Sequence, residues 1–530
     1  MAAKVLKNDQ HFGHLIVQVM KSNPEDICQI DAVTGEKETN ASVLSRSVRL
    51  ATCLRKLGAQ PGNVLAINGK NHLDLHIPYY AALFNGLPIC GVDNSFKYDE
   101  VKNIFNVILP KVAFCDRNAY EMFKKVVTDL NLETTVIRFG DGTNSMNEFM
   151  SKCDDQSIEE FRVAEFDVDK IYLWLATTSG TTGNAKVAAL KQAPIIAKFK
   201  SSYQALLKLT HEPRLTKRGV NTFNVGPIHW LTGLINALAL PLMGHCKVQT
   251  SGPANADHYA DIINQYKPVS LLTGPTTVST LLKHRKHCDF SCFQIIQVSG
   301  AKLRSEVYDE MCSRLSEGSF IINLYGQTET GGAILYSDPF GPRDALVMPT
   351  SDYELKITDP DTGLEVIEPM ARGELWCRGP GFTEYYRNPM ETKKAVTEDG
   401  WYKTGDIFCK DEAGYFYYVE RVKMLIKYKN YHMVPAELEE LIRSHPSVHD
   451  VVVTSIPHDE DGEHPVACVV KEKGANISAR EIADLIADKL SDNKRLRGGV
   501  IFLDEIPITS TGKIAVRKLK QIVLNSRREL

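Results

Sequence analysis

Short apolar runs alternate with segments of helical periodicity along most of the chain, most clearly between residues 171 and 324. The apolar runs are predicted strands: Ile171–Ala176, Asn221–Val225, Ser270–Leu272, Phe293–Val298 and Phe320–Leu324. The segments between them are predicted helices: Pro194–Leu209, Leu231–Leu242, Thr277–His284 and Ser305–Leu315. Strands that alternate with helices of about 10–15 residues predict parallel α/β layers.

The first 170 residues show the same alternation. Leu44–Leu57 has apolar residues at helical spacing, and Gly58 followed by Pro61-Gly62 ends this helix. Further predicted elements are the strands Val64–Ile67, Val112–Cys115 and Thr135–Phe139 and the helices Pro78–Phe84 and Ala119–Leu130, and Pro88–Val92 is a further apolar run. The large N-terminal part is therefore expected to contain doubly wound α/β subdomains.

The pattern changes at Tyr353. Strand-rich sequence with many turn residues runs to Tyr418 and predicts a small antiparallel β unit. A compact α+β segment of about a hundred residues follows, a size that can fold alone. We place the boundary at residue 422, with a large N-terminal domain at 1–422 and a smaller C-terminal domain at 423–530.

Composition excludes several classes of protein. The net charge is −3 with 43% hydrophobic and 24% charged residues, which is ordinary for a globular domain and gives no electrostatic footprint for nucleic acid. The longest apolar stretch, Leu231 to Gly244, is broken by Pro241 and is shorter than the ~20 residues that span a bilayer. We expect no membrane span, and a cytoplasmic rather than peroxisomal protein, because only Leu530 of the last three residues fits a Ser-Lys-Leu address.

The twelve cysteines form no CxxC pair, so zinc ribbons and thioredoxin-type sites are not expected. The group His284, His287, Cys288 and Cys292 matches no common zinc spacing. Reduced, mostly buried cysteines of an intracellular protein are the simplest interpretation.

The stretch Thr177–Lys186 carries the first chemical signal. It follows a predicted buried strand and contains Thr178, Ser179, Gly180, Thr181, Thr182, Gly183 and Lys186. Glycines let backbone N–H groups approach an anion, and hydroxyls and an ammonium add donors, so this loop is a candidate phosphate cradle. Its spacing excludes a GxxxxGK[ST] P-loop, because Val187 follows Lys186. A surface loop rich in Ser, Thr and Gly remains the competing interpretation.

Other loops follow predicted strands in the same way. They contain Pro227-Ile228-His229-Trp230, Gly274-Pro275, Ser299-Gly300-Ala301 and Tyr325 to Gly332. Ligands of parallel α/β sheets bind outside the carboxyl ends of the strands, so these loops are expected to share one ligand.

The ordered motifs resemble those of the adenylate-forming (AMP-binding) superfamily, which includes acyl-CoA synthetases, 4-coumarate-CoA ligases and insect luciferases. They are the 177–186 loop, Tyr325-Gly326-Gln327-Thr328-Glu329, Tyr402-Lys403-Thr404-Gly405-Asp406, Arg421 and Thr511-Gly512-Lys513. The resemblance covers most of the chain and implies attack of a carboxylate on the α-phosphate of ATP, with release of pyrophosphate.

The resemblance implies a role for each motif. The 178–186 loop holds the leaving phosphates, Glu329 holds Mg²⁺, Thr328 contacts the α-phosphate, and Lys513 lies between the carboxylate and that phosphate. Adenine contacts Tyr325 and the loop Ser299, Gly300 and Ala301, while Asp406 binds the ribose and Arg421 anchors it; Gly326 and Gln327 complete the ATP site. Taken singly, each of these residues also fits a structural role, such as a solvated acid, a turn residue or a surface lysine.

The resemblance also assigns a second step. Lys423 is the expected hinge about which the C-terminal domain moves, and Lys427, Lys429 and Asn430 are expected to approach CoA. His229, Trp230 and Thr232 are expected to line the acid pocket, although His229 fits a core histidine equally well. Departures from the common pattern include Asn430, where CoA ligases often have Gly, and Trp230, where beetle luciferases have a second His.

The sequence therefore predicts an acid–thiol ligase that uses ATP, Mg²⁺ and CoA on a small carboxylic acid. A luciferase that oxidises the adenylate with O₂ and emits light is the alternative, because both begin with the same adenylate. A nucleotide-binding regulator with a degraded site is a third, disfavoured by Glu329, Asp406, Arg421 and Lys513. Neither the acid nor the oligomeric state is predicted.

Overall fold

A computed structural model describes residues 11–153, 158–178, 186–210, 217–284, 288–301, 303–348, 352–428, 431–459, 461–490, 492–509 and 514–529. They divide into two compact units. Unit 1 comprises Met1–Glu354 and Arg378–Tyr402, and unit 2 comprises Leu355–Cys377 and Lys403–Leu530. The domain boundary at residue 422 stays a prediction.

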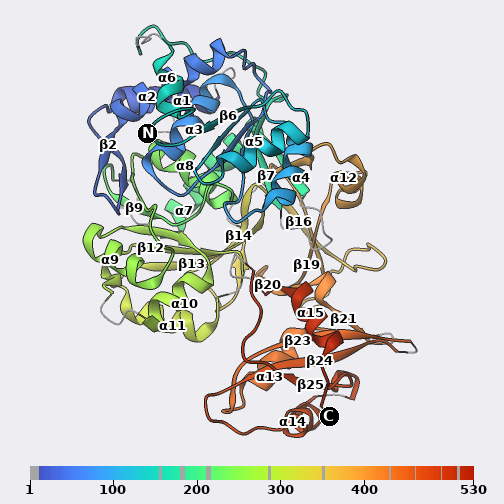
Figure 1. Ribbon diagram of the computed structural model, residues 1–530. Helices are drawn as coiled ribbons and strands as arrows, with labels where there is room; N and C mark the ends of the chain where they lie inside the picture. Colours follow the sequence, from blue (N-terminus) through green and yellow to red (C-terminus); the bar gives the residue numbers. More distant parts are fainter. Residues whose placement is uncertain are drawn as a thin grey trace. The chain divides into compact units, whose positions relative to one another are not determined.

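Unit 1 contains a seven-stranded sheet in the order β18-β8-β7-β4-β3-β5-β6. Its strands are β3 (Leu65–Asn68), β4 (Ile89–Gly91), β5 (Val112–Cys115), β6 (Thr135–Arg138), β7 (Tyr172–Thr178), β8 (Lys186–Lys191) and β18 (Phe382–Tyr385). Strands β6 and β7 of this sheet are labelled in Figure 1. Strands β6, β5, β3, β4 and β7 are parallel, whereas β8 runs antiparallel to β7 and β18 antiparallel to β8.

Helices cover both faces of this sheet. They are α1 (Phe12–Ser22), α2 (Asn40–Lys56), α3 (Ile77–Asn85), α4 (Tyr98–Ile108), α5 (Tyr120–Asp129) and α6 (Met146–Ser151). In β3, Leu65 and Ile67 pack into the core formed with α1–α3, and Ala66 packs into the core formed with α4 and α5. Successive strand residues point to opposite faces, so the continuous apolar run of β3 follows from burial on both sides.

A second set of sheet strands in unit 1 has the order β15-β14-β13-β12-β11-β9-β10-β1-β2. Its strands are β1 (Ile27–Asp31), β2 (Lys37–Thr39), β9 (Asn221–Asn224), β10 (Cys246–Gln249), β11 (Ser270–Thr273), β12 (Ile295–Ser299), β13 (Phe320–Gln327), β14 (Gly332–Ser337) and β15 (Leu346–Val347). The helices that follow or join these strands are α7 (Gln192–Thr210), α8 (Leu231–Met243), α9 (Ala256–Tyr266), α10 (Pro275–His284), α11 (Ser305–Arg314) and, after β18, α12 (Pro389–Ala395).

Helix α8 ties the two sheets of unit 1 together. Its residues Leu234, Ala237 and Leu238 belong to the same buried core as α3. The hydroxyl groups of Tyr79 and Tyr80 in α3 donate hydrogen bonds to carbonyl oxygens of α8, at 2.9 and 3.0 Å. The apolar run expected to be too short for a bilayer is thus an internal helix, and no helix in the described part of the chain is long and apolar enough to cross a membrane.

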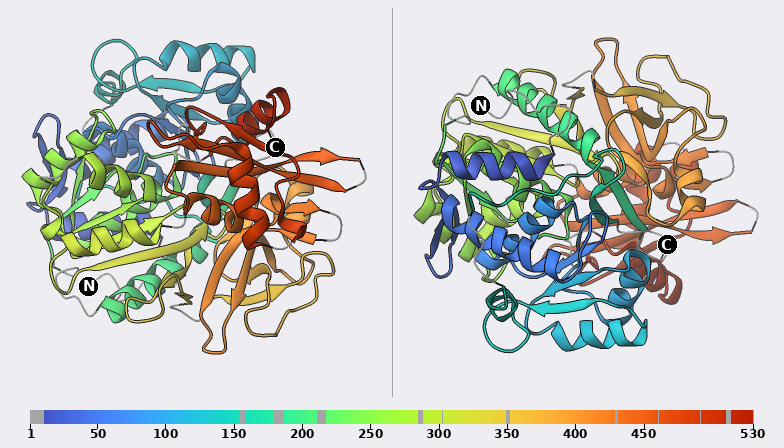
Figure 2. Two further views of the ribbon diagram at one scale, coloured as in Figure 1. Left: turned by 90° about the horizontal axis from the view of Figure 1, so that it is seen from below. Right: turned by 90° about the horizontal axis from the view of Figure 1, so that it is seen from above.

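Unit 2 begins with the strand order β16-β17-β19-β20 and ends with an α+β layer. The first group is β16 (Glu354–Thr358), β17 (Gly373–Arg378), β19 (Tyr402–Lys410) and β20 (Phe416–Arg421). The second is β21 (Ile426–Tyr428), β22 (Tyr431–Met433), α13 (Pro435–Arg443), β23 (Val448–His458), β24 (Gly462–Lys471), α14 (Ala479–Lys489), β25 (Val500–Phe502) and α15 (Val516–Asn525). Figure 2 shows these segments in orange and red from two further directions.

The predicted α/β fold class is confirmed, with differences in detail. Strand β18 lies within the segment predicted as one β unit but pairs with β8, through Phe382↔Leu190 and Tyr385↔Ala188. The expectation of reduced cysteines is wrong for Cys53 and Cys153, which form a disulfide although 100 residues separate them in sequence. Spacing could not reveal this pair, because α2 and the segment after α6 meet only in the fold. Most of the other cysteines are buried, as expected.

Candidate functional site

The candidate phosphate loop begins and ends on one strand pair. Thr178, the last residue of β7, lies opposite Lys186, the first residue of β8. The loop therefore leads into an antiparallel strand and not into a helix, which agrees with the exclusion of a P-loop. The expected phosphate contacts Ser179, Gly180, Thr181, Thr182 and Gly183 lie outside the described residues.

Lys186 is held between an acid and an aromatic ring. Its ammonium group forms an ion pair with Glu391 of α12 and lies 4.7 Å from the centre of the Tyr385 ring. Hydrogen bonds from Lys186, and then from Lys394, lower the pKa of Glu391 to about 2. The lysine is thus fixed at the mouth of the loop while remaining about one-fifth exposed.

Glu329 lies in a turn that follows β13, and the same tyrosine binds it. The side chain of Glu329 is 9% exposed, and its Oε1 accepts a 2.7 Å hydrogen bond from the Tyr385 hydroxyl. Burial, and next the charge of Glu329, raise the pKa of Tyr385, so its hydroxyl stays protonated and can donate. Tyr385 therefore connects the predicted phosphate lysine to the predicted metal-binding carboxylate.

The turn that carries Thr328 and Glu329 is held from both sides. The Thr330 hydroxyl donates to the Gln327 carbonyl at 2.9 Å, and the Gly331 amide donates to the Thr328 carbonyl at 3.0 Å. The Thr330 carbonyl accepts a 2.6 Å bond from the buried ammonium of Lys198. A hydrogen bond from a charged donor is stronger when the donor is shielded from water, so the bond from Lys198 to the Thr330 carbonyl stabilises this turn.

Tyr325, Gly326 and Gln327 belong to strand β13, which corrects the expectation that they lie in a loop. The reason is antiparallel pairing with β14, which extends the strand beyond its apolar run through Gln327↔Gly332. The Gln327 side-chain carbonyl accepts a 2.8 Å bond from the Tyr402 hydroxyl. This pairing adds Tyr402 to the group formed by Lys186, Glu329 and Tyr385.

The expected adenine residues lie at neighbouring strand ends. Ser299 is the last residue of β12 and lies opposite Leu324 of β13, one residue before Tyr325. Gly300 follows with φ of +95°, a conformation that suits glycine, and Ala301 is exposed. The structure thus places this loop and Tyr325 at the carboxyl ends of adjacent parallel strands, as expected for a shared ligand.

His229 lies against the end of strand β4. A Cβ atom on Gly91 would lie 2.4 Å from the Ile228 carbonyl oxygen and 2.5 Å from the His229 Cα, so only glycine permits this approach. Two residues later, Asp93 Oδ2 lies 3.3 Å from His229 Nε2, with both side chains largely buried. Burial lowers the pKa of His229, and the charge of Asp93 opposes that shift only in part, so the imidazole is neutral near pH 7.

His229 has a buried ring nitrogen and partly exposed neighbours. Its Nδ1 atom is buried without a hydrogen-bond partner among the described residues, a position that leaves a polar atom for a ligand. The rings of Trp230 and His229 pack edge-on with their centres 6.1 Å apart, and Trp230 is 37% exposed. Thr232 is half-buried at the start of α8. A buried neutral imidazole beside a partly exposed indole can line a pocket for an organic acid.

In unit 2, Asp406 and Arg421 lie opposite each other on β19 and β20. The Asp406 side chain is almost fully buried, and its Oδ1 lies 3.1 Å from Arg421 Nε. The carboxyl group thus lies beside a guanidinium, and carboxylate oxygens can accept ribose hydroxyls. Lys423, in the short 3₁₀ segment Val422–Met424, and Lys427 are exposed, whereas Lys429, Asn430 and Lys513 lie outside the described residues.

Two groups of predicted residues are therefore assembled within the units. Lys186, Glu329 and Gln327 gather around Tyr385 and Tyr402 in unit 1, and Asp406 meets Arg421 in unit 2. Sequence reasoning missed Asp93, Tyr385, Glu391 and Lys198. Asp93 could have been found, because it follows an apolar run at the carboxyl end of a strand. Tyr385 carried no such signal, since its strand pairs with β8 from a distant segment.

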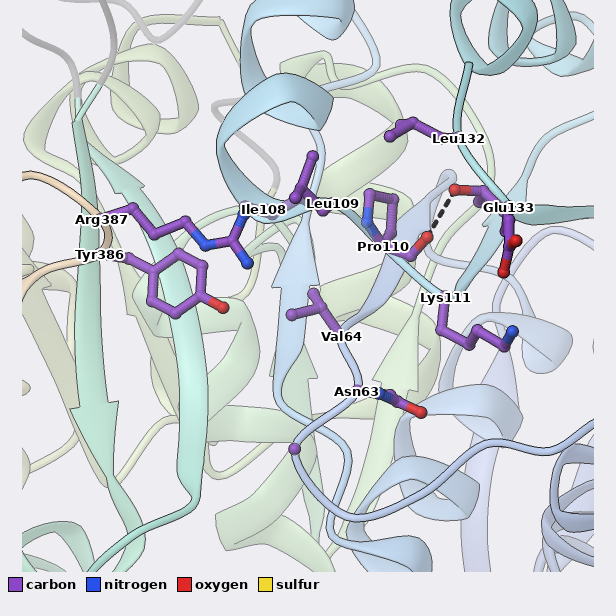
Figure 3. Close-up of a pocket in the computed structure, with 12 residues that line it drawn as sticks. Asn63, Val64, Ile108, Leu109, Pro110, Lys111, Leu132, Glu133, Tyr386 and Arg387 are labelled. Atoms are coloured by element: carbon purple, nitrogen blue, oxygen red, sulfur yellow. Dashed lines mark hydrogen bonds between the residues drawn. The ribbon is translucent and has the colours of Figure 1, made fainter. Parts of the chain in front are cut away.

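A cavity of about 230 Å³ in unit 1 lies among other residues (Figure 3). Tyr386 and Arg387 lie on one side of it and Lys111 and Glu133 on the other. The dashed bond in the figure is that of the Thr134 hydroxyl to the Pro110 carbonyl. None of the predicted site residues lines this cavity, so it does not belong to the candidate site.

Known protein families and individual proteins are similar to this chain over most of its length. The family model "AMP-binding enzyme" matches residues 17–387, and "AMP-binding enzyme C-terminal domain" matches residues 437–513. Luciferin 4-monooxygenase of Photuris pensylvanica is 30% identical over 512 residues, 94% of this chain and 92% of that protein. 4-Coumarate–CoA ligase-like 9 of Arabidopsis thaliana is 28% identical over 506 residues, 94% and 87% of the two chains.

A solved structure shares the fold. ATP-bound MatB from Rhodopseudomonas palustris superposes with a TM-score of 0.85 at 22% identity, covering 97% of this chain and 99% of that one. This structure shows the fold, and the matching family models and the 30% identical relative confirm the resemblance drawn from the ordered motifs.

Proposed function

Because the chain belongs to the AMP-binding enzyme family, we propose that it activates a small carboxylic acid with ATP and transfers the acyl group to CoA. The first step forms an acyl-adenylate and releases pyrophosphate, and the second forms a thioester. The observation that carries the proposal is Tyr385, which lies against Lys186 and donates to Glu329. The lysine proposed for the leaving phosphates and the carboxylate proposed for the metal thus contact the same tyrosine.

Two anions must approach each other in the first step, so fixed positive charge and N–H dipoles are needed where charge develops. We assign the β- and γ-phosphates to Lys186, Thr178 and the residues 179–183 between them. Thr328 contacts the α-phosphate, and Lys513 bridges it to the acid. Glu329 offers the oxygen ligand that Mg²⁺ prefers, and the bound ion would neutralise phosphate charge.

The nucleoside is assigned to residues at strand ends. Tyr325, with Ser299, Gly300 and Ala301, would hold adenine, and Gly326 and Gln327 complete this wall. In unit 2, the buried carboxylate of Asp406 is suited to two ribose hydroxyls, with Arg421 as its cationic neighbour.

The acid is assigned to the pocket of His229, Trp230 and Thr232. The neutral His229 adds no positive charge, so we assign it a hydrogen-bonding and shape role beside the reacting group. For the second step, Lys423 is the proposed hinge between domains 1–422 and 423–530, and exposed Lys427, with Lys429 and Asn430, is the proposed contact for CoA.

Acid-dependent ATP–pyrophosphate exchange with a panel of carboxylic acids tests the first step, and thioester formation with CoA tests the second. Lys513→Ala is expected to abolish most exchange, whereas Lys518→Ala, an exposed lysine of α15, is the matched control and should retain it. Normal exchange by Lys513→Ala would show that the assigned mechanism is wrong.

A luciferase is the second candidate, because luciferin 4-monooxygenases are 30% identical to the chain. The adenylate would then be oxidised by O₂. Mixing the protein with ATP, Mg²⁺ and candidate luciferins in a luminometer separates the two: light without CoA favours the luciferase, and darkness together with thioester formation favours the ligase.

A further inference from the structure

The tip of the long β23–β24 hairpin in unit 2 brings together His458, Asp461 and His464. The three side chains offer nitrogen and oxygen atoms that all lie within 4.8 Å of one another. In the described part of the chain, they are the one group of three or more metal-ligand side chains so arranged. Neither the ATP chemistry nor the acid pocket uses them.

The strand register explains why the histidines meet. His464 of β24 lies opposite Ile456, two residues before His458 on β23. Diagonal neighbours of this kind stand on the same face of an antiparallel pair. The two imidazoles stack with centroids 3.9 Å apart, and Asp461 reaches them from the turn.

The distances from Asp461 to the two histidines bracket the ligand spacing around a small transition-metal ion. Asp461 Oδ2 lies 2.8 Å from His464 Nε2 and 3.7 Å from His458 Nδ1. Ligands at about 2.1 Å from a tetrahedral zinc ion are roughly 3.4 Å apart, a value between these two distances. An ion bound through His458 Nδ1 would replace the long bond of 3.2 Å that this atom accepts from the Asp461 amide.

The surroundings favour ordered ligands. His464 and Asp461 are 13% and 19% exposed, and the ring of Tyr428 lies 5.9 Å from that of His464. The neighbouring Glu463 is engaged elsewhere, by the Ser455 hydroxyl at 2.8 Å and by the Lys427 amide at 2.9 Å. The exposed His458 leaves an opening through which an ion can enter and solvent can complete its coordination.

We propose that His458, Asp461 and His464 form a binding site for a zinc-class divalent transition metal ion. Two imidazoles and one carboxylate select such an ion over Mg²⁺ and Ca²⁺, which take oxygen ligands. The ion would close the end of a hairpin whose Gly462 pairs with Tyr428, and so would stabilise unit 2 near the strand that carries Lys427.

Zinc titration of the full chain, first freed of metal by a chelator, tests the site. The unmodified protein is expected to bind one more equivalent of Zn²⁺ than the double variant His458→Ala/His464→Ala, even in excess Mg²⁺, and its melting temperature should rise with Zn²⁺. His449→Ala is the control, because His449 lies on the same strand and bonds to Glu472 at 3.1 Å, outside the group. Equal stoichiometry in the double variant and the parent would overturn the proposal.

A second measurement avoids substitutions that could disturb folding. Diethylpyrocarbonate modifies accessible imidazoles, and mass spectrometry locates the modified residues in the unmodified protein. Zn²⁺ is expected to protect His458 and His464 but not His449. Protection that is absent, or equal at all three histidines, would refute the site independently of the variants.

Discussion

Replacing Tyr385 by phenylalanine removes one hydroxyl and leaves the ring over Lys186 in place. The lost hydrogen bond of 2.7 Å ends on the buried carboxylate of Glu329, and bonds to charged groups contribute about 1.5–3 kcal/mol. If the full value is expressed in the transition state, kcat/KM for acid-dependent pyrophosphate exchange falls about 10- to 150-fold. Exchange measured over a range of Mg²⁺ concentrations checks this.

The adjacent tyrosine supplies a matched control. Tyr386 contacts Tyr172 edge-on at 5.7 Å and lines the separate cavity of Figure 3. Tyr386→Phe is expected to change the exchange rate by about twofold at most, as for a substitution away from the site. Should Tyr385→Phe also stay within twofold of the parent at every Mg²⁺ concentration, the tyrosine does not position Glu329 for the reaction.

Three further changes probe other parts of unit 1. Asp93→Asn removes the charge that raises the pKa of His229, so the acid limb of the exchange pH profile should move to lower pH; an unmoved limb would separate His229 from the reaction. Burial lowers the pKa of His11 to about 4. Below pH ~6.5 the unfolded chain therefore binds more protons at this histidine than the folded chain does. The free energy of unfolding should fall by up to about 3 kcal/mol as the pH drops to about 4. Urea titrations measure that slope, which His11→Asn should flatten. Gly91→Ala would place a Cβ 2.4 Å from the Ile228 carbonyl oxygen and should lower the urea midpoint by an amount equivalent to about 1–3 kcal/mol or more, whereas an unchanged midpoint would contradict this packing.

Elements with strong local patterns were predictable from sequence. The strand expected at Val112–Cys115 is β5, and the helix expected at Pro78–Phe84 lies within α3. Both depend on apolar runs and on turn residues that act locally. The carboxyl-end rule correctly predicted that Ser299 and Tyr325 lie close to each other on adjacent strands, although Tyr325 lies within β13 and not in the loop that follows it.

Features that depend on distant pairing were not predictable. Strand β8 directly follows the Ser/Thr/Gly loop, and its Lys186 acquires partners from a segment about 200 residues later. Tyr385 and Glu391 look like ordinary surface residues in sequence, and only the pairing of β18 with β8 brings them to Lys186. The hairpin histidines were missed for the same reason, since their spacing becomes meaningful only once Ile456↔His464 is known.

The chain path through β17, β18 and β19 also determines how the protein can be dissected. The segment Arg378–Tyr402 belongs to unit 1, yet residues of unit 2 precede and follow it in sequence. A fragment ending at residue 354 would lose the tyrosine and the acid that contact Lys186. A fragment ending at residue 422 would separate the Asp406–Arg421 strand pair from the rest of its unit. A single peptide-bond cleavage therefore cannot yield two intact halves. Recombination between relatives should preserve activity only when residues 378–402 come from the same parent as residues 1–354, and residues 355–377 from the same parent as residues 403–530.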